Sequence, residues 1–216
     1  GGAVVVGGLV GMFVGKLLPE RLRTSVMAAL SLMTIGIAVP GLLKSNNALI
    51  PIISMVVGTL IGELLDIDSA VNKLGEKLQK RFSGSRVTEG FVTGSLVFAV
   101  GALAVMGPLE SGLQHQHSLL FSKSVIDGVA SIVFASTMGL GVALSGITVF
   151  VVEGSIALLA SVVAPYLGEA VVNEITFVGS LLIVGISLNL LGATKLRILN
   201  MVPAILLPIL LCRFMG

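Results

Sequence analysis

The chain has 216 residues, of which 55% are hydrophobic and 11% are charged, and its formal net charge at pH 7 is +2. Soluble domains usually carry about a quarter charged residues, so this composition excludes an ordinary water-soluble protein. The chain has no Lys/Arg cluster interleaved with aromatic residues, which argues against nucleic acid as a partner. We therefore predict an all-α integral membrane protein that contacts the lipid bilayer along most of its length.

Eight apolar stretches approach the length of a membrane-spanning helix, which needs about 20 mainly apolar residues. They lie near residues 2–18, 25–43, 48–65, 90–107, 124–144, 147–166, 175–191 and 196–214. Strands are excluded at these positions because open sheets cannot lie in lipid. The sequence predicts one domain over residues 1–216, a polytopic helix bundle of about eight spans, or seven, with broken or glycine-interrupted helices.

Segment 66–89 is the only sizeable polar stretch between the apolar ones. Within it, Val71, Leu74, Leu78 and Phe82 recur at helical spacing, with lysine and glutamate residues between them. This pattern is typical of an amphipathic helix that lies on a membrane surface with its basic face in water. The alternative interpretation is a docking surface for another protein.

The distribution of Lys and Arg predicts the orientation in the membrane. If the loop after the first span is cytoplasmic, the loops after spans one, three and seven hold ten of the 13 basic residues. Both termini would then lie outside the cell, and segment 66–89 would lie in the cytoplasm.

An internal repeat would fit the glycine spacing. Residues 8–15 and 139–146 share glycines seven residues apart, and Pro40 and Pro165 then close the following spans. Four spans separate the two copies, so this repeat would be a parallel 4+4 arrangement rather than an inverted one. The competing explanation is that glycine-rich apolar helices resemble one another by chance.

Two places in the sequence indicate broken helices. Proline lacks an N–H, so we expect the helix to end at Gly107-Pro108. Residues 109–121 would then form a partly embedded segment on the external side, with Glu110 near its start. The second place is 135–141, where small hydroxyl residues meet two glycines inside a predicted span. This pattern indicates either close helix packing or an unwound segment that offers carbonyls and hydroxyls to a solute.

Ionisable residues inside spans are costly and suggest function. Asp127 follows Lys123 by four residues, which places both on one helix face, where they could line a path or simply neutralise each other. We expect Glu153 to lie in span six, nearer the cytoplasmic exit. Glu63 and Asn189 lie near the cytoplasmic ends of spans three and seven, where either could cap a helix. The candidate substrate-path residues are Asp127, Lys123, Ser131, Ser136, Thr137, Glu153, Glu63, Asn189 and Glu110.

Catalytic and cofactor motifs are absent from the sequence. It has no P-loop, no zinc-protease motif and no serine-hydrolase motif. His115 and His117 fall in a polar patch typical of a solvated loop, and Cys212 is the single cysteine. We therefore expect neither an enzyme nor a bound cofactor or metal.

Several motifs resemble those of a known family. They are KSVIDG at 123–128, FASTMGLGV at 134–142, EG at 153–154, LLA at 158–160, LPERLR at 18–23, GTLIGE at 58–63 and GISLNLL at 185–191. Over essentially the whole chain, the sequence resembles the bacterial inner-membrane family known as domain of unknown function 554, the YqgA-like or YdfK-like proteins. The resemblance implies a multi-pass protein of the bacterial inner (plasma) membrane, and it implies no substrate or reaction.

The leading functional hypothesis is a small transporter or channel for an ion or small polar solute. It is motivated by the glycine-interrupted spans, the intramembrane Asp127 and Glu153, and the hydroxyl pair Ser136-Thr137. The alternative is a membrane scaffold or regulatory protein without transport activity. A transporter should have a cavity lined by these groups, whereas a scaffold should have them paired in a dry interior. Exposed glycine faces favour a homodimer.

Overall fold

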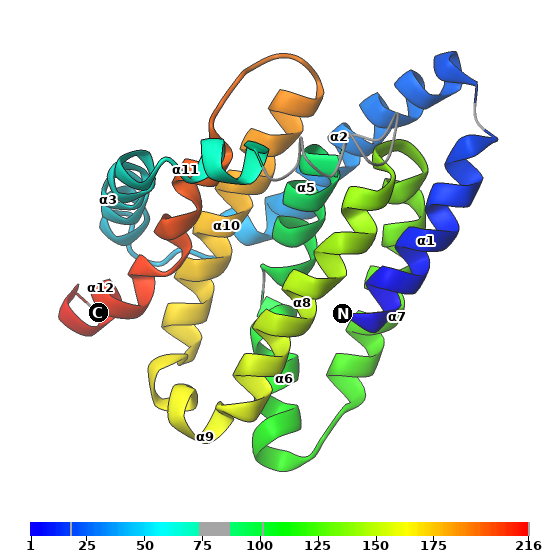
Figure 1. The fold of residues 1–216 in the computed structure, drawn as a ribbon. Coiled ribbons are helices and arrows are strands. Elements are labelled where there is room, and N and C mark those ends of the chain that lie inside the picture. The colour runs from blue at the N-terminus through cyan, green and yellow to red at the C-terminus, as the bar shows by residue number, and fades with distance from the viewer. Residues whose placement is uncertain (18, 74–86, 101, 216) are drawn as a thin grey trace.

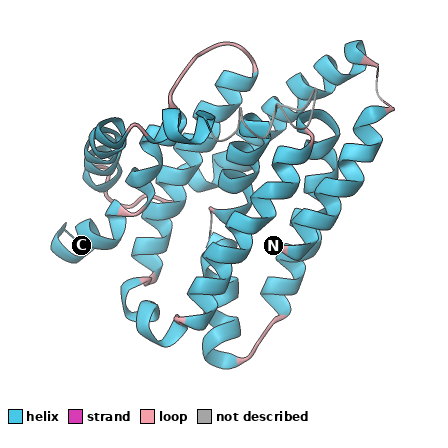
Figure 2. Cartoon of the chain, viewed as in Figure 1, coloured by secondary structure: helices cyan, strands magenta, loops and turns pink. Residues whose placement is uncertain are grey.

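The computed structural model describes residues 1–17, 19–73, 87–100 and 102–215. Within these ranges the chain is a bundle of helices and contains no strand (Figures 1 and 2). The α-helices are α1 (Gly2–Lys16), α2 (Glu20–Leu42), α3 (Leu49–Leu65), α5 (Val87–Ala99), α6 (Ala102–Gln114), α7 (Ser118–Met138), α8 (Leu140–Leu158), α9 (Ala160–Val163), α10 (Glu169–Leu190), α11 (Ile198–Met201) and α12 (Leu207–Met215). Two 3₁₀ helices, η1 (Ala164–Tyr166) and η2 (Val202–Ile205), and the short helix Ile67–Lys73 complete the bundle.

Each predicted span has a helical counterpart, which confirms the polytopic helical bundle. Four helices are long and apolar enough to cross a membrane: α2 from Thr24, α7, α8 and α10. Three pairs of helices meet at bends of 51°, 56° and 42°, and the number of spans rises to seven if each pair counts as one. Helix α1 is apolar but has only 15 residues.

Helix α10 is the most enclosed of the four long helices, with 67% of its most apolar window buried. It packs mainly against α2, and it also contacts α5, α12 and η2. Its buried apolar residues include Val178, Leu182 and Ile186. Because a helix that is apolar on all sides can be covered on all sides, its composition fits this central position.

Helix α1 runs along α7 at very short range. A Cβ added at Gly7, Gly11 or Gly15 would lie 2.2, 2.2 or 2.3 Å from a backbone carbonyl oxygen of α7. Only hydrogen at these positions allows the two backbones to approach so closely, as in other membrane helix pairs with small residues at the interface. We call these three residues the α1 glycine seam.

The turn between α7 and α8 corrects one predicted boundary. The break falls at Gly139, whose φ of +71° suits glycine, and not at Ser145-Gly146, which lie inside α8. Within segment 135–141, Gly139 alone therefore connects two helices, and the residues on either side of it are helical. The residues on both sides of Gly139 are apolar, so no polar loop marks the turn in the sequence.

The predicted break at Gly107-Pro108 is also wrong. Helix α6 runs through both residues to Gln114, and α7 begins at Ser118, so residues 109–121 are mostly helical, and α5 with α6 forms either one broken span or a re-entrant pair. The bend lies upstream instead, at 56° between α5 and α6. Proline holds φ near the helical value, and neighbouring helices can compensate for its missing N–H in a membrane protein.

The loops gather at the two ends of the bundle. The α1–α2 connection, helix Ile67–Lys73, the Gly139 turn and loop 191–197 lie at one end, whereas residues 115–117 and 159–168 lie at the other (Figure 1). We call the first the Arg197 end. This grouping agrees with the loops that the basic residues assign to one side, and the side that faces the cytoplasm stays a prediction. Most of the predicted surface helix, residues 74–86, lies outside the described residues.

Candidate functional site

Three ionisable side chains meet inside the bundle between α7 and α8. Lys123 Nζ lies 2.8 Å from Glu153 Oε1, and it also donates a hydrogen bond to Asp127 Oδ2. It donates a further hydrogen bond of 2.7 Å to the carbonyl oxygen of Phe98. Lys123, Asp127 and Glu153 are only 6%, 8% and 7% exposed. We call these three residues the Lys123 cluster.

Local structure explains how the Lys123 cluster forms. The four-residue spacing places Lys123 and Asp127 on one face of α7. Phe98 lies in the last turn of α5, where helix carbonyls have no intrahelical donor. Glu153 lies beside Lys123, 14 residues along α8 from the Gly139 turn, so the expectation that it lies nearer that end of its span is wrong.

The other candidates on α7 hydrogen-bond to their own helix. Ser131 donates to the carbonyl of Gly128 at 2.8 Å, and Ser136 donates to that of Val133 at 2.7 Å. Thr137 donates to the carbonyl of Phe134 at 3.0 Å. Together with the Lys123 cluster, they form the paired interior that the sequence analysis associated with a scaffold. Glu110 lies apart from them on α6 and is partly exposed.

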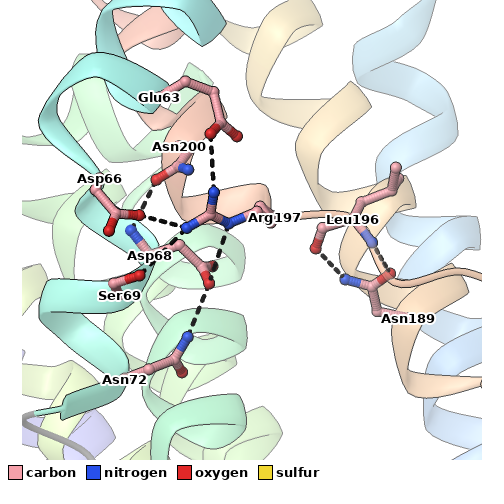
Figure 3. A network of polar contacts seen from close by, with 9 residues as sticks. All are labelled: Glu63, Asp66, Asp68, Ser69, Asn72, Asn189, Leu196, Arg197 and Asn200. Atoms are coloured by element: carbon pink, nitrogen blue, oxygen red, sulfur yellow. Dashed lines mark hydrogen bonds and ion pairs between the residues drawn. The ribbon is translucent and has the colours of Figure 1, made fainter.

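A second group of charges surrounds Arg197, in the part of the molecule defined above as the Arg197 end, and Figure 3 shows its contacts. Arg197 donates to Glu63 Oε2 at 2.9 Å, to Asp66 Oδ1 and to the Ser69 hydroxyl at 3.2 Å. The side chains of Arg197, Glu63 and Asp66 are 45%, 44% and 53% exposed. We call these four residues the Arg197 network.

Within this network, Asp66 contacts both Arg197 and Ser69. It ends α3 in the left-handed conformation, with a φ of +46°, and so redirects the chain into helix Ile67–Lys73. Hydrogen bonds from the hydroxyl of Ser69 and the guanidinium of Arg197 hold the pKa of Asp66 below its usual range. The charged form of Asp66 is therefore the one that the fold stabilises.

Asn189, at the end of α10, holds loop 191–197 through its side chain. Its side-chain oxygen accepts hydrogen bonds from the Leu196 N–H at 2.9 Å and the Thr194 hydroxyl at 2.7 Å. Its amide nitrogen donates to the Leu196 carbonyl at 2.7 Å. The loop is thus fixed by Asn189 on one side and by Arg197 on the other (Figure 3).

A cavity of about 530 Å³ lies between these two anchors. It is lined by Asp68, Asn72, Thr88, Glu89, Val92, Thr93, Ile186, Asn189, Leu190, Thr194, Lys195, Leu196, Ile198 and Leu199. Exposed residues such as Lys195 and Leu196 form its outer part, whereas Thr93 and Ile198, which are 1% and 3% exposed, form its buried end. We call it the Thr93 cavity.

Thr93, like Ser54, differs from most of the buried hydroxyls. Ser31, Thr34, Thr176 and Ser187 each donate to a carbonyl four residues earlier in their own helix. The Thr93 hydroxyl has no hydrogen-bond partner anywhere in the described part of the chain. An unpaired buried polar group in a native fold calls for an explanation, and this one lines a cavity.

Sequence reasoning identified two residues of this region, Glu63 and Asn189, as candidates. It counted Arg197 only as a topological charge and did not identify Thr93. Three acids between 63 and 68 would draw attention to their neighbourhood, but the arginine that joins them is more than 100 residues away. One threonine in an apolar helix gives no signal in a single sequence.

Comparison with known proteins finds two relatives that match nearly the whole chain. It is 31% identical over 209 residues to the uncharacterised membrane protein YdfK of Bacillus subtilis, covering 95% of this chain and 90% of the relative. It is 27% identical over 212 residues to the uncharacterised protein YqgA of Escherichia coli, with the same coverage. No solved structure matches the chain. The model of the family described as protein of unknown function (DUF554) matches residues 1–213, and the chain belongs to that family.

Proposed function

We propose that this membrane protein is a small transporter or channel for an ion or small polar solute, which enters through the Thr93 cavity. The observation that carries the proposal is the cavity itself. It is about 530 Å³ in volume and reaches from exposed loop residues to the buried Thr93 between α5 and α10. Concave sites between helices, with a few polar groups in an apolar wall, are the usual form of small-molecule sites.

The bent helices support the same proposal. Helix α5, which carries Thr93, is bent by 56° against α6, and α3 is bent by 51° against helix Ile67–Lys73. Transporters commonly bind solutes where such discontinuous helices leave backbone groups without intrahelical partners. The Phe98 carbonyl at the α5 end is such a group, and here it binds Lys123.

The second candidate function is a membrane scaffold or regulatory protein without transport activity. The Lys123 cluster favours it, because Lys123 contacts both carboxylates and all three groups are buried. On this alternative the paired charges hold helices together, and no solute passes them. The two functions differ in whether solute moves and in whether the Thr93 cavity lies on its route.

Flux measurements in proteoliposomes would test the proposal. After a screen identifies a transported solute, Leu196→Cys in a Cys212→Ser background places a reactive thiol in the cavity lining, on a side chain that is 42% exposed. Labelling with a bulky thiol reagent should abolish flux, whereas the unlabelled variant should remain active. The matched control is Leu191→Cys, which is 38% exposed in the same loop but does not line the cavity.

Two results would contradict the proposal. If no ion or solute moved in a broad screen of correctly folded protein, the scaffold alternative would be the better account. If labelling at Leu196 and at Leu191 had the same small effect on flux, the solute would follow a route other than the Thr93 cavity.

A further inference from the structure

We infer that the Thr93 cavity binds a small organic molecule rather than a bare ion, with the Thr93 hydroxyl as its hydrogen-bond partner at the buried end. This inference rests on the proposed function and narrows its substrate class. Three observations support it: the volume of the cavity, the hydrogen bonds that the oxygen atoms of Asp68 and Asn189 already accept, and the Thr93 hydroxyl, which has no partner among the described residues.

The dimensions of the cavity suit an organic molecule. Small-molecule sites commonly enclose about 300–1,000 Å³, and this cavity of about 530 Å³ falls within that range. A bare divalent cation such as Ca²⁺ instead needs about six to eight oxygen ligands that converge at roughly 2.3–2.6 Å. Across the ranges 1–17, 19–73, 87–100 and 102–215, no three His, Cys, Asp or Glu residues group together in this way.

The best oxygen ligands in the lining are already engaged. Asp68 Oδ2 accepts a hydrogen bond from Asn72 at 2.8 Å and lies 3.8 Å from the Arg197 guanidinium. The Asn189 side-chain oxygen accepts two hydrogen bonds from loop 191–197. A bare ion would compete with these contacts for the same oxygens, whereas an organic solute can bind with them intact.

Thr93 supplies the polar contact at the buried end. Its hydroxyl can donate one hydrogen bond and accept others, yet it has no partner among the described residues. The lining residues Val92, Ile186 and Ile198 are all buried and apolar. Because the charged residues of the lining, Asp68, Glu89 and Lys195, are less buried than these, an uncharged group such as a hydroxyl, carbonyl or amide fits best against Thr93.

Binding to purified protein in detergent tests this inference without any flux measurement. The probes are amino acids, sugars, polyols and short-chain amides on one side, and chloride salts of Na⁺, K⁺, Mg²⁺ and Ca²⁺ on the other. We expect at least one organic probe to raise the melting temperature. Its Kd should rise about tenfold or more in Thr93→Val, which keeps the shape and removes the hydroxyl. Thr93→Ser should largely retain the native Kd.

The matched control is Thr176→Val, because Thr176 is a buried hydroxyl that donates to its own helix and does not line the cavity. It should leave the Kd unchanged. The inference is overturned if only a salt stabilises the protein in a Thr93-dependent way, if an organic probe binds equally well to Thr93→Val, or if no organic probe binds.

The failure of this inference can be distinguished from the failure of the transport proposal. Thr93-dependent binding of an organic probe that is never transported would support the inference and defeat the transport proposal. Flux of a bare ion through the cavity, blocked by labelling at Leu196, would support transport and defeat the inference.

Discussion

The Lys123 cluster and the Arg197 network both join one basic side chain to carboxylates, but in different surroundings. Lys123 contacts two carboxylates, whereas Arg197 contacts Glu63, Asp66 and, at 3.8 Å, Asp68, and each group joins segments that are distant in the sequence. The side chains of the Lys123 cluster are 8–12% exposed, whereas those of Arg197, Glu63 and Asp66 are 44–53% exposed. The main difference between the two groups is their access to water.

This difference determines what each group can do. Removing one partner from a buried ion pair leaves an uncompensated charge and is strongly destabilising. Exposed ion pairs contribute little, because water and salt replace the lost partner. The Lys123 cluster is therefore suited to hold α7, α8 and the end of α5 in one arrangement. Loss of a contact in the Arg197 network, beside the Thr93 cavity, should cost little.

Lys123→Gln should produce the largest effect. It removes the buried cation that contacts both Asp127 and Glu153, which should lower the free energy of unfolding by about 3–5 kcal/mol. Thermal unfolding of the purified protein would measure this. Lys44→Gln is the control at a partly exposed lysine, and it should change stability little.

Asp127→Asn sharpens the same comparison. Lys123 still has Glu153 as a partner, so the stability loss should be smaller than for Lys123→Gln. The double variant Asp127→Asn with Lys123→Gln should not restore stability fully, because Glu153 still lacks its lysine partner. Full restoration by the double variant would show that Glu153 contributes nothing. Loss of flux without loss of stability in Asp127→Asn would instead support a transport role for this pair.

Arg197→Gln should have a much smaller effect on stability, because the charges that it leaves behind are solvated. Its effect should appear in loop 191–197, where amide hydrogen exchange should become faster than in the native protein. Arg213→Gln, at an exposed arginine of α12, is the control and should leave exchange in the loop unchanged. A melting-temperature loss as large as that of Lys123→Gln would remove the distinction between the two groups.

The smallest expected effect is the loss of the contribution of Asp66 to stability in acid. The pKa of Asp66 is lowered in the folded protein, so its contribution to stability is present above the ordinary value of 3.8 and is lost as pH falls further through the folded pKa. The stability difference between the native protein and Asp66→Asn should thus be constant from neutral pH down to about 5 and shrink only in stronger acid. Measurement of both proteins over this range would test it, and a difference that vanished near neutral pH would contradict it.

The sequence predicted the helical spans better than it predicted the contacts between them. Apolar length marks a span directly, and every predicted stretch has a helical counterpart. The turn at Gly139 has apolar residues on both sides, and Pro108 lies within a helix that continues through it. Neither feature could therefore be predicted from the residues next to it in the sequence. The four-residue spacing of Lys123 and Asp127 predicted their contact. The contact between Glu153 and Lys123 depends on how α8 packs against α7, which cannot be predicted from the spacing of residues along one helix.

The α1 glycine seam has a consequence for how this family can vary. The nearest atoms to Gly7, Gly11 and Gly15 include backbone carbonyl oxygens, which cannot move aside as a flexible side chain can. On the exposed face of the same helix lie Val6, Val10 and Phe13, which are 64%, 45% and 63% exposed. Even one methyl group at a seam position would force the two helix axes apart. Tolerance to substitution along α1 should therefore repeat every four residues. On the face that contacts α7 only glycine should be accepted, whereas on the exposed face almost any apolar side chain should be accepted.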